Sequence, residues 1–203
     1  MNRTLRLAES RLYLVLDGTT PGTVLEAALR GGVDVVQLRD KQLPDDELVE
    51  AAQPFRRACD AFGALFILND RPDLVAACGA DGVHVGQSDA SVAAACATVG
   101  EDRLVGLSIE TETQLDATEG ADYLGVGAVF STPTKTESVA GGLELVRAAA
   151  KRVSIPWFAI GGIDLANVAQ VAAAGAPGVA VVRAIRDAED PETAARALRT
   201  ALE

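Results

Sequence analysis

The sequence predicts an α/β fold, a single (β/α)8 TIM barrel, and three observations support this. Short apolar runs rich in β-branched residues recur along the chain, as buried parallel strands require. Helical patterns lie between most of these runs, and strand alternating with helix calls for a parallel sheet. Eight such runs follow one another without a linker, which favours a closed barrel over an open doubly wound sheet.

The first half of the chain supplies four strands and four helices. Strands are predicted at 12–16, 33–38, 64–68 and 82–85, where Leu, Val and Ile predominate. Helices are predicted at 24–30, 45–62, 72–78 and 90–99. Each of these helices is followed directly by a glycine, the residue most common just after a helix ends.

The second half continues the alternation. Strands are predicted at 104–108, 123–126, 155–160 and 179–182, and helices at 112–118, 143–152 and 165–174. The stretch between Phe130 and Leu143 is longer than a typical strand-to-helix loop, and suits either a lid over a site or an ordinary polar loop. With 203 residues and 49% hydrophobic composition, we expect one domain over residues 1–203.

Charge and cysteine content limit the possible functions. A net charge of -11 argues against a nucleic-acid or anionic-membrane surface, so an anionic ligand needs a local cationic pocket or a metal. The cysteines, Cys59, Cys78 and Cys96, are odd in number and widely spaced, which favours reduced thiols and a cytoplasmic location. We expect neither a signal peptide nor a membrane-spanning segment, because no apolar stretch reaches roughly 18 residues.

Polar residues gather where the predicted strands end, the rim at which barrel enzymes carry their active sites. The strand starts, in contrast, carry routine turn residues such as Gly79-Ala80-Asp81. The strand-end residues, in chain order, are Gln37, Arg39, Lys41, Asn69, Asp70, Gly86, Gln87, Asp89, Ser108, Gly127, Ser131-Thr132-Pro133-Thr134-Lys135, Gly161, Gly162, Val182 and Arg183.

The group after the second predicted strand suits an anion. Strand side chains alternate between faces, so Gln37, Arg39 and Lys41 converge on one volume. Two cations and an amide at this spacing suit a phosphate or diphosphate. A solvated strand end is the alternative for such a cluster taken alone.

Two aspartates form a candidate magnesium site. Asp70 and Asp89 follow neighbouring strands, and Mg²⁺ favours carboxylate oxygens together with a substrate phosphate. Alternatively, Asp70 caps the turn at Pro72 and Asp89 caps the helix predicted from Ala90.

Two further features concern the later strands and the barrel interior. Gly161-Gly162 opens from the seventh strand toward a helix, so its backbone N–H groups suit a phosphate, although paired glycines also serve tight turns. The single histidine, His84, alternates with valines and is expected to face the interior as a hydrogen-bonded core residue rather than as a general base.

Taken together, these motifs resemble the thiamine phosphate synthase family over residues 12–191. The segments that carry the resemblance, in order, are Gln37-Leu38-Arg39-Asp40-Lys41, Asn69-Asp70, Asp81-Gly82-Val83-His84-Val85-Gly86-Gln87 with Asp89, Gly106-Leu107-Ser108, Gly125-Val126-Gly127, Thr132-Pro133-Thr134-Lys135 and Ala159-Ile160-Gly161-Gly162-Ile163. Several ordered motifs are far more specific than any one of them.

The resemblance implies a transferase of thiamine biosynthesis that joins 4-amino-2-methyl-5-(diphosphooxymethyl)pyrimidine to thiazole phosphate, releasing diphosphate by a Mg²⁺-assisted dissociative mechanism. It implies that the pyrimidine diphosphate is held by Gln37, Arg39, Lys41, Asn69, Ser108 and Lys135. Of these, Arg39, Ser108 and Lys135 are implied to act in catalysis, and Asp70 and Asp89 to bind Mg²⁺. The residues implied to hold the thiazole phosphate are Thr132, Thr134, Gly162, Val182 and Arg183.

Two departures from the family pattern and two rival functions stay open. Arg183 stands where the family usually has Ser, and the loop between Leu16 and Val24 looks shortened. One rival is a thiazole tautomerase-like relative, which would not need the aspartates, and the other is a non-catalytic barrel that binds a phosphorylated metabolite. The expected partners are small molecules, with no nucleic acid and no membrane. The sequence leaves open a homo-oligomer and whether the thiazole carries a carboxylate.

Overall fold

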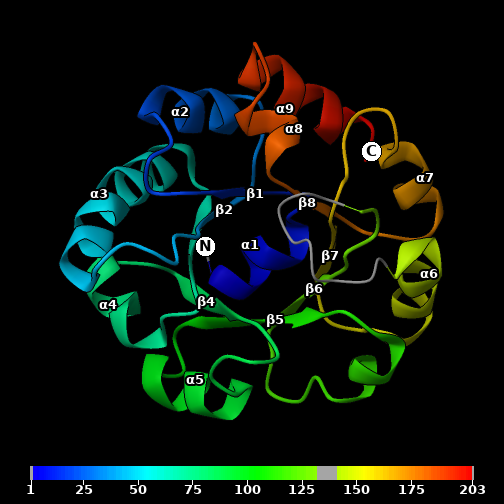
Figure 1. Cartoon of the computed structure of the whole chain (residues 1–203), viewed down its shortest axis with the longest axis horizontal. Helices are drawn as coiled ribbons and strands as arrows, with labels where there is room; N and C mark the ends of the chain where they lie inside the picture. The colour runs from blue at the N-terminus through cyan, green and yellow to red at the C-terminus, as the bar shows by residue number, and fades with distance from the viewer. Residues whose placement is uncertain (1, 132–140, 203) are drawn as a thin grey trace.

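A closed barrel of eight parallel strands forms the centre of the molecule (Figure 1), which confirms the predicted fold class. The computed structural model describes residues 2–131 and 141–202. Each strand pairs with the next in chain order, and the last closes on the first. The strands are β1 (Leu12–Leu16), β2 (Val35–Leu38), β3 (Leu65–Asn69), β4 (Gly82–Val85), β5 (Leu104–Ile109), β6 (Tyr123–Val126), β7 (Trp157–Ile160) and β8 (Val179–Val181).

Helices surround the barrel and agree in part with the predictions. They are α1 (Arg3–Glu9), α2 (Gly22–Arg30), α3 (Asp45–Phe62), α4 (Val75–Cys78), α5 (Val92–Val99), α6 (Gly142–Arg152), α7 (Val168–Ala173), α8 (Arg183–Arg186) and α9 (Pro191–Thr200). Two segments are 3-10 helices, η1 (Pro72–Leu74) and η2 (Glu112–Asp116), so the helix predicted at 112–118 is present as a shorter 3-10 helix. The predictions did not include α1, α8 or α9.

The alternation along each strand separates two apolar clusters. In β1, Leu12, Leu14 and Leu16 pack outward against the helices, whereas Tyr13 and Val15 belong to the cluster inside the barrel. Both clusters are almost fully excluded from water, which is the main stabilising contribution of the fold.

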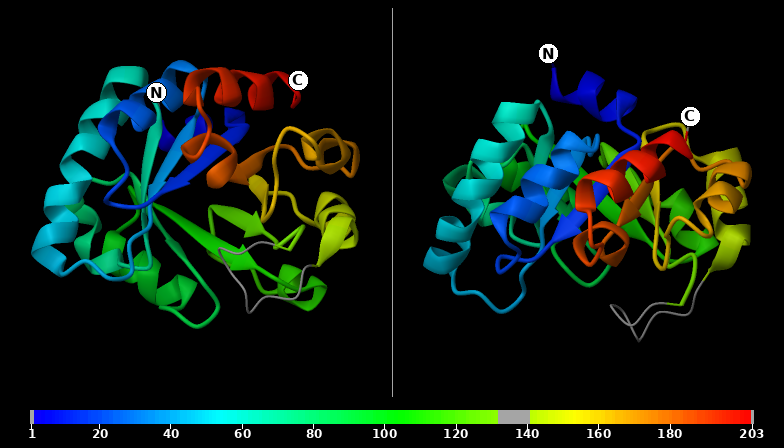
Figure 2. Two further views of the ribbon diagram at one scale, coloured as in Figure 1. Left: turned by 45° about the horizontal axis from the view of Figure 1, so that its top comes forward. Right: turned by 90° about the horizontal axis from the view of Figure 1, so that it is seen from above.

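Helix α1 closes the amino-terminal end of the barrel. In Figure 1 it crosses the middle of the ring, and Figure 2 shows it lying beyond one end of the strands. Its Leu7 is 1% exposed and joins the interior cluster. An apolar side chain therefore fills the amino-terminal end of the barrel interior. None of the helices in the described part of the chain is long and apolar enough to cross a membrane.

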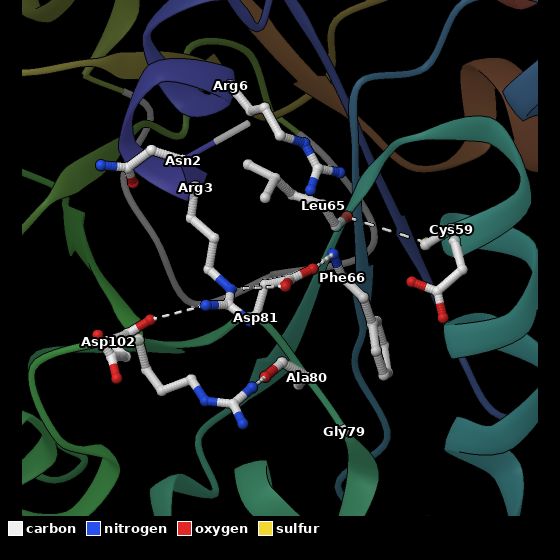
Figure 3. Close-up of polar contacts among 12 residues, drawn as sticks. Asn2, Arg3, Arg6, Cys59, Leu65, Phe66, Gly79, Ala80, Asp81 and Asp102 are labelled. Atoms are coloured by element: carbon white, nitrogen blue, oxygen red, sulfur yellow. Dashed lines mark hydrogen bonds and ion pairs between the residues drawn. The ribbon is translucent and has the colours of Figure 1, made fainter.

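Carboxylates fasten the strands together at the amino-terminal end. Asp34, Asp81 and Asp122 each stand just before an even-numbered strand, β2, β4 and β6. Asp81 accepts hydrogen bonds from the amide of Phe66 at 2.9 Å and from Nε of Arg3 at 2.8 Å (Figure 3). Asp122 likewise accepts the amide of Val105 at 2.7 Å. These contacts satisfy amides near the start of β3 and β5 and tie those strands to their neighbours.

Candidate active site

A cavity of about 960 Å³ opens at the carboxyl ends of the strands. Every member of the predicted site set that lies within the described residues lines it: Gln37, Arg39, Lys41, Asn69, Asp70, Asp89, Ser108, Gly162, Val182 and Arg183. The parallel order of the strands brings these residues together from all parts of the chain. Thr132, Thr134 and Lys135, with the loop predicted as a lid, lie outside the described residues.

Residues at the end of β2 form the cationic side of the cavity. Gln37 is 4% exposed, and the backbone amide of Arg39 donates to the carbonyl of Leu16 at 2.8 Å, which continues the ladder beyond the strand. Lys41 places its Nζ 2.7 Å from Oδ2 of Asp70 on the neighbouring loop. All three residues line this one cavity, which confirms the predicted convergence of Gln37, Arg39 and Lys41 on one volume.

The two predicted metal-binding aspartates face the same cavity and do not cap helices. Asp70 has φ +59°, and it is the one non-glycine residue with positive φ in the described part of the chain. Its amide donates to the carbonyl of His84 at 2.8 Å, which ties this turn to β4. Asp89 accepts the amide of Gly86 at 2.9 Å through Oδ2.

The capping alternatives are wrong for both aspartates. Arg71 stands at the N-cap of η1 and makes no side-chain capping bond there, and the side chain of Asp70 pairs with Lys41 instead. Helix α5 starts later than predicted, and its N-cap is Ser91. The backbone conformation of Asp70 is uncommon even for aspartate, and such conformations are often associated with function.

The electrostatic balance of the cavity favours an added cation. Among the described lining residues the acidic ones, Asp17, Asp70, Asp89, Glu110, Asp164 and Asp187, outnumber the basic ones, Arg39, Lys41, Arg183 and Arg186. No group of three His, Cys, Asp or Glu side chains in residues 2–131 and 141–202 could hold a metal by itself. Coordination by two carboxylates, with water and substrate oxygens as the remaining ligands, is typical of Mg²⁺.

The glycine turn after β7 approaches the opposite side of the cavity. Gly161 and Gly162 have φ +106° and +64°, and a Cβ on Gly162 would lie 2.8 Å from Cβ of Phe130. Asn167 holds the turn by donating its Nδ2 to the Gly162 carbonyl at 2.8 Å. The predicted helix at 165 begins only at Val168, so the turn does not open directly into a helix.

The end of β8 completes this side of the cavity. Val182 stands at the N-cap of α8, a helix of four residues. Arg183 follows it, and its side chain is exposed to solvent. The cavity is therefore lined by Arg39, Lys41, Asp70 and Asp89 after β2 to β4 and by the glycine turn and Arg183 after β7 and β8.

Two buried amides face this space with unused hydrogen-bonding capacity. Asn69 is 7% exposed, and its Nδ2 has no hydrogen-bond partner among the described residues. Gln37 donates Nε2 to the hydroxyl of Tyr13 at 2.8 Å, while its Oε1 accepts no hydrogen bond from residues 2–131 or 141–202. The buried Nδ2 of Asn69 is costly to leave without a partner, and a polar ligand relieves that cost.

The floor of the cavity contains two tyrosines that the sequence-based site set did not include. Tyr13 and Tyr123 lie 3.1 Å apart between their hydroxyl oxygens, and burial raises the pKa of both phenols above the ordinary value of 10.0. His84 faces the interior, as predicted, with Nδ1 3.2 Å from the Tyr123 hydroxyl and Nε2 2.9 Å from Oγ of Ser108. The alternation of Tyr13 with three outward leucines was the available signal for its inward position.

Known proteins similar to this chain share one description. The family model described as thiamine monophosphate synthase matches residues 12–185. A thiamine-phosphate synthase of Nostoc punctiforme is 51% identical over 168 residues, which cover 80% of this chain and 47% of that protein. The counterpart from Streptomyces avermitilis is 47% identical and covers 80% of both chains.

Solved structures agree with this similarity. A thiamine phosphate pyrophosphorylase from Pyrococcus furiosus superposes with a TM-score of 0.89 at 33% identity, covering 98% of this chain and 97% of that one. A 3-hexulose-6-phosphate synthase, at 20% identity and a TM-score of 0.69, shares the fold. The chain spans about half the length of several curated relatives, including the one from Nostoc punctiforme.

Proposed function

The chain belongs to the thiamine monophosphate synthase family, and on that premise we propose that it is a thiamine phosphate synthase. It joins 4-amino-2-methyl-5-(diphosphooxymethyl)pyrimidine to thiazole phosphate and releases thiamine phosphate and diphosphate. The observation that carries the proposal is the convergence of all described members of the predicted site on one cavity at the carboxyl ends of the strands. Barrel enzymes perform their chemistry at that end.

In this proposal the diphosphate lies beside Arg39 and Lys41. Negative charge grows on the diphosphate as its bond to the pyrimidine methylene breaks, so cations placed there stabilise the transition state more than the ground state. The thiazole nitrogen then attacks the pyrimidine methylene cation, and no side chain has to act as a nucleophile. Ser108 and the buried amides of Gln37 and Asn69 orient the pyrimidine on the cavity floor.

We propose that Asp70 and Asp89 hold Mg²⁺ next to the diphosphate. The excess of carboxylates in the cavity supports this, because two phosphorylated substrates would otherwise add to an already negative lining. When bound, Mg²⁺ neutralises charge on the leaving diphosphate.

The thiazole phosphate is assigned to the other side of the cavity. Gly162 and Val182 line the cavity there, and backbone N–H groups at such turns suit a phosphate. Roles for Thr132 and Thr134 at this phosphate, and for Lys135 at the diphosphate, rest on the family resemblance. We also propose a single domain over residues 1–203 and a cytoplasmic location, which the three unpaired cysteines support.

The test is an assay with both substrates and Mg²⁺, measuring thiamine phosphate and diphosphate together. We expect the two products in equal amounts and dependence on both substrates. Conversion of the thiazole phosphate without diphosphate release would instead indicate a tautomerase. Binding of both compounds without any product would indicate a non-catalytic phosphate-binding barrel.

A further inference from the structure

Five side chains from five strands form one hydrogen-bonded chain across the cavity floor. Nε2 of Gln37 lies 2.8 Å from the Tyr13 hydroxyl, which lies 3.1 Å from the Tyr123 hydroxyl. From there the chain continues to Nδ1 of His84 at 3.2 Å, and from Nε2 of His84 to Oγ of Ser108 at 2.9 Å. We call these five residues the floor relay. Both of its ends, Gln37 and Ser108, line the cavity.

The barrel interior leaves room for this relay at the cost of side-chain packing. A Cβ on Gly106 of β5 would lie 2.2 Å from Cζ of Tyr123 and 2.5 Å from Nδ1 of His84. A Cβ on Gly125 of β6 would lie 3.2 Å from Cε1 of His84. Phe158 packs its ring edge-on against Tyr13, with ring centroids 5.2 Å apart. Two inward positions thus carry no side chain where the histidine and tyrosine rings meet.

With the Gln37 amide turned so that Nε2 faces Tyr13, counting protons gives the direction of the other hydrogen bonds. Gln37 donates its Nε2 proton to Tyr13, so the Tyr13 hydroxyl proton is directed to Tyr123, the remaining acceptor within reach among the described residues. Tyr123 then donates to Nδ1 of His84, which leaves the ring proton on Nε2 and directs it to Ser108. Both phenols stay protonated because burial raises their pKa. The Ser108 proton is then left for the cavity.

To reverse the floor relay, donor and acceptor would have to exchange roles in all four hydrogen bonds together. Turning the amide of Gln37 would bring its oxygen to Tyr13, and Tyr13, Tyr123 and His84 would all have to donate in the opposite sense. A partial reversal leaves the buried hydroxyl of Tyr13 between two donors, with no acceptor for its own proton in the described residues. The orientation of Gln37 and the tautomer of His84 are therefore coupled through the two tyrosines.

We propose that Tyr13 and Tyr123 are positioning residues that hold the floor in one pattern, with the amide oxygen of Gln37 as an acceptor and the hydroxyl of Ser108 as a donor toward the ligand. The ligand class that matches is a neutral heterocycle with an exocyclic amino donor and a ring-nitrogen acceptor. The choice of the aminopyrimidine as that ligand rests on the proposed function. The relay itself is a property of the free protein.

The first test therefore needs no ligand. His84 is the only histidine in the chain, so the ¹⁵N signals of its ring can be assigned without ambiguity. We expect the Nε2-protonated tautomer in the wild type at neutral pH. The Nδ1-protonated tautomer would show that the relay runs the other way, and it would overturn the proposal whatever the protein binds.

The second test measures discrimination between two pyrimidine diphosphates by calorimetry with Mg²⁺. One is the 4-amino compound, and the other is its 4-oxo analogue, which presents an acceptor in place of the amino donor. We expect the wild type to favour the amino compound by about a hundredfold or more, because the oxo group would face the Gln37 oxygen. Tyr13→Phe should reduce that ratio at least about tenfold, since the amide of Gln37 is then free to turn.

Two further variants separate positioning from packing. Phe158→Leu disturbs the ring against Tyr13 without removing a hydroxyl, and should weaken binding of both compounds while leaving their ratio within about twofold. In a Gln37→Ala background, Tyr13→Phe should no longer change the ratio, because Tyr13 acts through Gln37.

The positioning role of Tyr13 would be overturned if Tyr13→Phe left the ratio of the two affinities unchanged. It would also be overturned if Tyr13→Phe changed that ratio as much in the Gln37→Ala background as in the wild type. A wild type that binds neither pyrimidine diphosphate would overturn the proposed function instead. In that case the tautomer of His84 still decides whether the relay exists.

Discussion

Aspartates stand at both ends of this barrel, and the difference between their surroundings separates structure from chemistry. At the amino-terminal end, Asp34 accepts the amides of Arg11 and Leu12 at 2.8 and 2.9 Å, and it also pairs with Arg199. At the carboxyl end, Asp70 and Asp89 follow β3 and β4 and border a cavity. The first group is held by several hydrogen bonds from the chain itself, whereas Asp70 and Asp89 each engage only Oδ2 in such a contact among the described residues and border space that a ligand can enter.

Asp81 shows how completely the amino-terminal carboxylates are used. Burial by itself would raise its pKa, but hydrogen bonds from Arg56, from the amide of Phe66 and from Arg3 outweigh that effect and lower the pKa below its ordinary value. Its side chain is 6% exposed. A carboxylate in this state contributes to stability and has little capacity for a further ligand.

Both ends also contain a cavity with basic side chains. The amino-terminal cavity, of about 560 Å³, is lined by Arg3, Arg6, Arg56 and Arg103. Each of these guanidinium groups already donates to a carboxylate or a backbone carbonyl, as Arg6 does to Gly63 at 2.6 Å. The presence of arginines therefore does not by itself identify an anion site, because each of them already donates at least one hydrogen bond within the protein.

The largest expected effect is the loss of activity on substitution of Asp70, at the carboxyl end of the barrel. Asp70→Asn should lower kcat/KM about a thousandfold, roughly 4 kcal/mol, because an amide keeps the shape but supplies no charge to the metal. The melting temperature should stay within about 2 °C of the wild type, since the side chain supports no strand. Steady-state kinetics at saturating Mg²⁺ and a thermal melt measure both. Activity within about twofold of the wild type would remove Asp70 from the metal site.

The matched substitution at the other end should act on stability. Asp81→Asn should lower the free energy of unfolding by about 3 kcal/mol, because Arg3 and Arg56 lose their charged partner. Activity per folded molecule should be unchanged. Denaturant unfolding followed by an assay below the midpoint measures these effects. A stable protein without activity would place Asp81 in the chemistry and contradict the division between the two ends.

The pH dependence of Asp81→Asn sharpens this result. Since folding lowers the pKa of Asp81 below its ordinary 3.8, the charged carboxylate stabilises the wild type above that pH. That contribution is lost as the pH falls through the lowered pKa. The stability difference between wild type and variant should therefore be constant from pH 5 to 7 and shrink below about pH 4.

Glycine substitutions separate backbone strain from site geometry. Gly162 and Gly142 share φ +64°, but a Cβ on Gly142 has no atom within 4 Å, whereas one on Gly162 meets Phe130 at 2.8 Å. Gly162→Ala should weaken binding of thiazole phosphate about thirtyfold, roughly 2 kcal/mol. Gly142→Ala introduces the same backbone strain without a steric clash, so it should leave the affinity for thiazole phosphate within about twofold of the wild type. Calorimetry on both variants decides whether the turn holds the phosphate.

The smallest effect is expected at Arg183. Its side chain is exposed, and the turn beside it already offers backbone donors, so Arg183→Ser should change thiazole phosphate affinity less than about tenfold, or roughly 1.4 kcal/mol. A larger loss, measured by the same calorimetry, would show that the guanidinium contacts the phosphate directly.

The barrel could be predicted because its strands are marked by local composition. All eight predicted strands exist, and β1, β4 and β6 have the predicted bounds. Helix α1 was missed because it is short and buries one residue, Leu7, which leaves no periodic pattern. Helix α9 did carry a signal, an Asp190 cap followed by Pro191, which the predictions did not use.

The candidate site was predictable as far as strand order determines it. Because the strands are parallel, Gln37, Asp70 and Asp89 come to one rim. This can be predicted without knowing the side-chain conformations. The floor relay could not be predicted, because it depends on the register between strands and on rotamers that bring the hydroxyls of Tyr13 and Tyr123 to 3.1 Å. The alternation of residues along a strand predicts that such side chains lie inside the barrel, but it does not predict which of them touch.

The most direct test of the division between the two ends is where the pyrimidine diphosphate binds. Backbone amide shifts should be followed by NMR during titration with the compound in the presence of Mg²⁺. We expect the largest changes at 37–41, 69–70 and 86–89, and none beyond noise at 2–6 or 101–103. Saturable shifts centred on the arginine-lined cavity of the amino-terminal end, with the carboxyl end unchanged, would contradict the account.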